Sequence, residues 1–159
     1  MTATVDVVIE DPRWETLDLD ALATRAVDAA LAEVGLTQPV EVALLAAADA
    51  RLADLNETFR GRPTPTNVLS WPSQPLRPGD TPSEDRFGRA ALGDIALAYE
   101  TCAAEAAAKP CPLRDHVCHL IVHGLLHLLG HDHEIEEEAQ IMEKLEVSAL
   151  ARLGLSTPY

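Results

Sequence analysis

In the first third of the chain, the pattern of hydrophobic and polar positions changes twice from the period of a strand to that of a helix. Residues 5–9 are mostly apolar, which predicts a short strand, and apolar residues then recur at helical spacing over 19–34. Residues 40–45 alternate as a half-buried strand does. Asp49 is placed to cap a second helix. The apolar positions of that helix are Leu52, Leu55 and Phe59.

The second part of the chain continues with two strands and three helices. Residues 68–71 predict a short strand at a sheet edge, because Pro72 follows directly. The proline-rich stretch 72–91 is too long for an ordinary connection and suits a mobile lid or a loop along a substrate path. Further elements are a strand over 92–97 and helices over 98–108, 113–129 and 135–153. This order predicts a single α/β (α+β) domain over 1–159, a small mixed sheet of about four strands packed with about five helices.

Composition limits the classes of function. Hydrophobic residues make up 47% and charged residues 24% of the 159 residues, which are ordinary globular values. The sequence shows neither a signal peptide nor a membrane span, so a cytoplasmic protein without membrane contact is expected. The net charge of −14 argues against a large basic nucleic-acid surface. Aromatic residues are few, so any bound RNA is expected to be held by its backbone.

The strongest chemical signal is the histidine distribution, because all six histidines lie within residues 116–133. His123 and His127 are four residues apart and project from one face of the predicted helix. Gly130 ends that helix and permits a sharp reversal that brings His133 back over the pair. Three neutral imidazoles leave one position open, which is typical of a catalytic zinc site. We therefore expect one Zn²⁺ ion at this triplet.

The remaining histidines have more ordinary explanations. His116 and His119 are expected to be structural, although His119 lies one turn before His123 and could orient it. His131 sits in the turn and is an alternative ligand. Asp132 precedes an acidic run and is expected to cap the last helix, with orientation of a ligand histidine as the alternative.

The spacing of the triplet is also that of metzincin proteases, whose zincin-like helix carries a glutamate directly after the first histidine. Here that position is Gly124. Without this carboxylate a peptidase lacks its general base, so a metzincin-like metallopeptidase is the weaker interpretation. A phosphodiester is a better substrate, because its cleavage mainly needs an activated nucleophile and positive charge near the phosphate.

Positive charge is concentrated in one part of this acidic chain. Residues 60–89 contain five arginines against three acidic residues, and arginine suits bidentate phosphate contacts. Arg60 lies just before the predicted edge strand and is the expected phosphate-binding residue. Arg77, Arg86 and Arg89 are equally well explained as solvated loop charges. If Arg60 is not the phosphate ligand, Arg62 and Arg89 are the next candidates.

Three motifs occur together in this chain: His123-Gly-Leu-Leu-His127-Leu-Leu-Gly130-His-Asp-His133, Leu55-Asn-Glu-Thr-Phe-Arg60-Gly with Pro65-Thr66-Asn67-Val68-Leu69-Ser70-Trp71-Pro72, and Leu92-Gly93-Asp94-Ile95. These motifs resemble those of the YbeY family of bacterial single-strand-specific endoribonucleases, also called rRNA maturation factors. The resemblance covers about residues 40–155. It departs from the family pattern at His131, where tyrosine is usual, and at Trp71, where phenylalanine is usual.

The resemblance implies zinc at His123, His127 and His133, and an arginine important for activity at Arg60. It also implies 16S rRNA 3′-end maturation and ribosome quality control in association with the ribosome. Thr66 and Ser70, beside the edge strand, are further candidates for substrate binding, and Asp94 is either structural or close to the site. A metal-stabilised, non-catalytic ribosome assembly factor remains the main alternative to an endoribonuclease.

Overall fold

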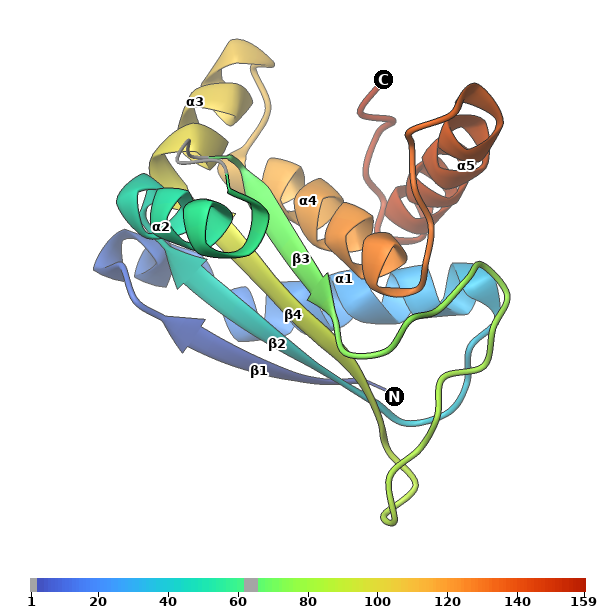
Figure 1. Cartoon of the computed structure of the whole chain (residues 1–159). Coiled ribbons are helices and arrows are strands. Elements are labelled where there is room, and N and C mark those ends of the chain that lie inside the picture. Colours follow the sequence, from blue (N-terminus) through green and yellow to red (C-terminus); the bar gives the residue numbers. More distant parts are fainter. Residues whose placement is uncertain (1–2, 62–65) are drawn as a thin grey trace.

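A computed structural model describes residues 3–61 and 66–159 of the chain (Figure 1). In chain order the elements are β1 (Ala3–Ile9), the 3₁₀ turn η1 (Pro12–Thr16), α1 (Leu19–Val34), β2 (Val40–Ala47), α2 (Asp49–Arg60), β3 (Val68–Pro72), β4 (Ala90–Ala98), α3 (Tyr99–Ala108), α4 (Leu113–Leu128) and α5 (Glu136–Arg152). Four strands and five α-helices in the described ranges confirm the predicted α/β class. The turn η1 was not predicted.

The four strands form one mixed sheet in the order β1-β2-β4-β3. β1, β2 and β4 are parallel, and β3 pairs antiparallel with β4. The prediction of an edge strand before Pro72 is confirmed, because β3 forms one border of the sheet. Residues 73–89 connect β3 to β4 as a long loop that projects beyond the sheet (Figure 1).

Helices cover the two faces of the sheet unequally. α1, α4 and α5 pack against one another on one face, and α4 also lies along β3 and β4. The main hydrophobic core lies between these helices and the sheet. α2 covers part of the other face above a small cluster of Ala47, Leu52, Leu69, Ala96 and Ala98. In the described ranges, no helix combines the length and apolar character that crossing a bilayer requires.

The apolar patterns predicted most of the buried helix faces. In α1 the predicted inward positions from Leu19 to Leu31 are buried, and Gly35 ends the helix with a φ of 75°. In α2, Leu52 is buried, but Phe59 is exposed and contacts Trp71 edge-on, with ring centroids 5.5 Å apart. Phe59 therefore belongs to the surface rather than to the core.

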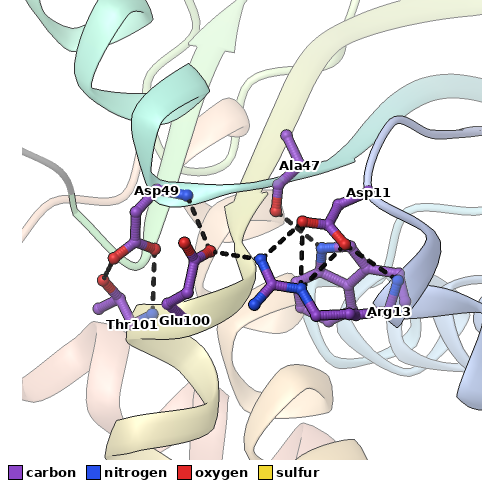
Figure 2. A network of polar contacts seen from close by, with 7 residues as sticks. Asp11, Arg13, Ala47, Asp49, Glu100 and Thr101 are labelled. Atoms are coloured by element: carbon purple, nitrogen blue, oxygen red, sulfur yellow. Dashed lines mark hydrogen bonds and ion pairs between the residues drawn. The ribbon is translucent and has the colours of Figure 1, made fainter.

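The prediction that Asp49 caps its own helix is wrong. At the ends of β2 and β4, residues at the start of one helix bind free N–H groups at the start of the other (Figure 2). Asp49 does not cap its own helix, which begins after Ala48 without a side-chain cap. Its carboxylate instead accepts from the backbone N–H of Thr101 at 3.0 Å, while the Asp49 N–H donates to Glu100 at 3.1 Å. Because β2 and β4 are neighbours, the helices that follow them start side by side and exchange caps.

Candidate metal centre

Two imidazoles of α4 meet one turn apart at its carboxyl-terminal end. His123 and His127 project from the same face of the helix, and their Nε2 atoms lie 3.0 Å apart. Their ring centroids are 4.5 Å apart, and both side chains are half-buried. The helical repeat alone produces this pairing.

A glycine turn brings a third imidazole to this pair. Gly130 has a φ of 99°, and the chain reverses after α4 before α5 begins. The ring of His133 lies 5.4 Å from that of His123 and 5.1 Å from that of His127, measured between centroids. One ring nitrogen from each residue falls within 4.8 Å of the other two, so the three could hold one metal ion. His133 is exposed, which leaves this side of the site open.

Gly130 also makes room for the long loop. A Cβ atom at this position would lie 2.3 Å from the Leu76 carbonyl oxygen and 2.8 Å from the Cα of Arg77. No side chain fits there without movement of backbone. The 73–89 loop therefore packs directly on the turn that carries His133.

Hydrogen bonds to the other ring nitrogens select the tautomers of His123 and His127. Nδ1 of His127 donates to the carbonyl oxygen of His131 at 2.9 Å, and Nδ1 of His123 donates to Glu146 at 2.9 Å. Both Nε2 atoms then carry lone pairs, and these face each other. Two converging lone pairs repel unless a cation lies between them, so the donor set fits a metal ion.

The electrostatics of the site keep one imidazole neutral. Burial, followed by the nearby His123 and His133, lowers the pKa of His127 to about 4. Burial also lowers the pKa of His131. A metal ligand must be deprotonated, and His127 meets that condition throughout the neutral range.

Glu146 contacts the three-imidazole group and was not among the residues expected from the sequence. It lies on α5, is buried, and accepts hydrogen bonds from His119, His123 and Tyr159. Burial by itself would raise the pKa of this carboxyl, but the three hydrogen bonds outweigh it and lower the pKa to about 2. A signal was present, because Glu146 occupies the apolar stripe of its helix between Met142 and Leu150.

The structure separates the roles expected for neighbouring residues. The ring of His131 is outside the three-imidazole group, and its backbone carbonyl accepts from Nδ1 of His127. His116 binds Glu105 at 2.9 Å, in agreement with a structural role. The prediction that Asp132 caps the last helix is wrong, because α5 begins after Ile135 and Asp132 instead accepts from the His133 N–H at 2.7 Å.

A groove of about 880 Å³ runs between the histidines and the edge of the sheet. One wall is the end of α4 with residues 130–134, and the other is β3 with residues 72–76. Three predicted residues, Arg60, Thr66 and Ser70, line this groove together with His123, His127 and His133. None of the residues described along the groove is a phenylalanine, tyrosine or tryptophan.

Arg60 is the last residue of α2 and reaches the outer side of β3. Its Nη2 donates to the carbonyl oxygen of Ser70 at 3.2 Å, while the side chain stays exposed. Asp94 is not in this groove, because it lines a separate, mostly apolar hollow on the sheet with Val8 and Trp71.

Of the candidate arginines that the structure describes, Arg60 lines the groove, whereas Arg77, Arg86 and Arg89 do not. Arg89 forms an ion pair with Glu41, and Arg86 lies over the ring of Phe87. The candidate Arg62 lies outside the described residues.

Gly124, which replaces the glutamate of metzincins, packs tightly on the sheet. A Cβ atom there would meet the side chain of Ile95 on β4 at 3.3 Å. The helix is therefore closely packed on β4 at the position where a protease would carry its general base.

Comparisons with known proteins cover nearly the whole chain. The family model described as "Endoribonuclease YbeY" matches residues 6–154. The chain is 54% identical to an endoribonuclease YbeY of Dinoroseobacter shibae, with 99% of this chain and 91% of the relative covered. It is also 54% identical to one of a Jannaschia species, with 98% and 99% covered. A Thermotoga maritima protein solved in solution is similar in fold, with a TM-score of 0.56, 21% identity, and 95% of this chain and 92% of that chain covered.

Proposed function

This chain belongs to the YbeY family of endoribonucleases, and we propose that it cleaves single-stranded RNA with one Zn²⁺ ion held by His123, His127 and His133. The observation that carries the proposal is the meeting of these three imidazoles on one wall of a groove whose other wall carries Arg60. We propose that residues 1–159 act as one endoribonuclease domain.

The choice of zinc rests on the donor set. Three imidazole nitrogens with an open side are the ligand type and number of catalytic zinc sites. When bound, zinc supplies a Lewis acid that activates a nucleophile and stabilises negative charge on phosphate oxygens. The chain's own contribution is to present Nε2 of His123 and His127 with their protons held on Nδ1.

The opposite wall of the groove supplies contacts for the RNA backbone. Arg60 is exposed beside the edge strand, where its guanidinium can bind the scissile or a neighbouring phosphate. Thr66 and Ser70 offer hydroxyls for phosphate or ribose contacts. Without an aromatic residue along the described lining, the groove favours recognition of the backbone over stacking of bases.

The biological role is proposed from the family resemblance. We expect the substrate to be precursor rRNA, with cleavage contributing to 16S rRNA 3′-end maturation and to ribosome quality control. An acidic protein with a small positive region gains little from non-specific RNA attraction, so association with the ribosome would place it on its substrate. The expected location is the cytoplasm.

One experiment separates a nuclease from a non-catalytic, metal-stabilised assembly factor. Metal content and cleavage of a single-stranded rRNA fragment are measured for the wild type and for His127→Ala, with a duplex of the same sequence as a second substrate. We expect about one zinc per wild-type chain, cleavage of the single strand only, and loss of both metal and cleavage in the variant. Equal cleavage by both proteins indicates a contaminant, and metal-loaded wild type without cleavage refutes the nuclease.

A further inference from the structure

A carboxylate lies in the apolar interface between α4 and α5, where a charge is costly unless it is paired. Glu146 is 1% exposed and occupies the inward stripe of α5 between Met142 and Leu150. An ionised carboxylate in such a place persists only when its oxygens accept several hydrogen bonds. The partners of Glu146 therefore indicate what this residue does.

Glu146 accepts three hydrogen bonds, and one of them comes from a member of the three-imidazole group. Oε1 accepts from Nε2 of His119 and from Nδ1 of His123, each at 2.9 Å. Oε2 accepts from the hydroxyl of Tyr159 at 2.8 Å. His119 and Tyr159 also contact each other edge-on, with ring centroids 5.8 Å apart. These two residues hold the carboxylate, and the carboxylate holds His123.

We propose that Glu146 is a positioning residue that holds His123 in the orientation and tautomer needed for metal binding, with His119 and Tyr159 fixing the carboxylate from behind. The inference rests on the proposed metal site. A carboxylate that accepts a hydrogen bond from Nδ1 keeps the proton on that nitrogen and the lone pair on Nε2. It also limits rotation of the ring and makes Nε2 a stronger electron-pair donor to a metal.

The arrangement gives the two helical ligands different supports. His127 donates to the backbone carbonyl of His131, which is neutral and comes from the turn directly after α4. His123 donates to a charged side chain from another helix, 23 residues away in sequence. Through Glu146 the packing of α5 on α4 becomes part of the metal site, so metal affinity depends on a helix that supplies no ligand.

The chain contains a matched control for this inference. On the same helix, His116 binds Glu105 at the same distance of 2.9 Å, but His116 is not in the three-imidazole group. The Glu105 side chain is 38% exposed and lies on α3. Glu105 also accepts from the Asn67 side chain at 3.0 Å. Removing its charge alters a histidine–carboxylate pair of the same length without touching the support of a proposed ligand.

The test measures zinc affinity by competition with a chromophoric chelator for the wild type, Glu146→Gln and Glu105→Gln. Glutamine keeps the shape of the side chain and removes its charge. We expect Glu146→Gln to weaken zinc binding about 10- to 100-fold and Glu105→Gln to match the wild type. An unchanged affinity in Glu146→Gln, or an equal loss in both variants, overturns the proposal.

A second measurement uses the zinc-loaded wild type and does not depend on a variant folding. Imidazole ¹⁵N resonances should show His123 protonated at Nδ1 and metal-bound at Nε2, and coordination through Nδ1 overturns the proposal. If the wild type binds no zinc, the proposed metal-dependent function fails as well. If it binds zinc and cleaves RNA while Glu146→Gln binds zinc equally well, only the role of Glu146 is refuted.

Discussion

Replacing Gly130 with alanine tests how the turn after α4 places His133. The backbone there has a φ of +99°, which costs an L-residue about 1–2 kcal/mol. The new Cβ atom would also lie 2.3 Å from the Leu76 carbonyl oxygen, so the turn or the 73–89 loop must move by a large fraction of an ångström. Overpacking of this kind costs about a further 1–3 kcal/mol.

Gly35 provides the matched control for this change. It has a φ of +75° at the end of α1, but a Cβ atom there meets nothing within 4 Å. Gly35→Ala should therefore cost about 1–2 kcal/mol of unfolding free energy from strain alone. Gly130→Ala should cost about 2–5 kcal/mol, because strain and displacement act together.

The two variants should differ even more in zinc affinity. A histidine nitrogen binds zinc at a distance of about 2.0–2.1 Å, so a displaced His133 binds the ion poorly. Denaturant unfolding of the metal-free proteins and chelator competition for zinc measure the two effects separately. We expect only Gly130→Ala to lose affinity. Equal destabilisation of both variants with wild-type zinc affinity would show that the turn does not position His133.

Four further outcomes are expected. Arg60→Ala should keep its metal content but cleave RNA about 10²-fold more slowly, and Arg60→Lys should recover little because the bidentate fork is lost; full activity in Arg60→Ala refutes its role. The pKa of His127 is lowered from 6.5 to about 4, so between these pH values the unfolded chain binds a proton at His127 that the folded protein does not. The unfolding free energy of the metal-free protein should therefore fall as the pH drops from 6.5 towards 4. Denaturant titrations that show no fall across this range contradict the lowered pKa. When the free zinc concentration is about 100 times the Kd, removing the zinc with a chelator should lower the unfolding free energy by about 2.7 kcal/mol. The loss is seen as a lower Tm, and an unchanged Tm argues against a metal that joins the turn to α4. Gly124→Glu should destabilise the fold, because the new side chain is crowded by Ile95, and it should not create peptidase activity. Thermal unfolding checks the first expectation and a peptide-cleavage assay checks the second.

The local part of the candidate site could be predicted from the sequence. The helix expected over 113–129 is α4, Leu113–Leu128, and the residue expected to reverse the chain, Gly130, has a positive φ. His123 and His127 meet because residues four apart on any α-helix share a face. Such features depend on backbone geometry over a few residues, which residue type and spacing determine directly.

The two wrong capping predictions show where local reasoning ends. Asp49 and Asp132 both stand where a helix cap is common, yet neither caps the helix that follows it. Asp49 reaches Thr101 instead, because the order of strands places α2 beside α3. The tertiary structure therefore decides the partner of Asp49. Asp132 accepts from the N–H of the adjacent His133 instead, because α5 begins only after Ile135.

The order of the strands and α-helices, the buried faces of most helices, and the three imidazoles with their glycine turn follow from local patterns of residue type and spacing. Two other features depend on how distant segments pack: β3 and Arg60 lie across a groove from those imidazoles, and Glu146, on another helix, accepts a hydrogen bond from His123. The physical reason is that hydrophobic periodicity specifies which face of an element is buried but not which element covers it. That choice depends on packing between segments far apart in the chain, and it places a charged residue such as Glu146 beside the partners that make its burial possible.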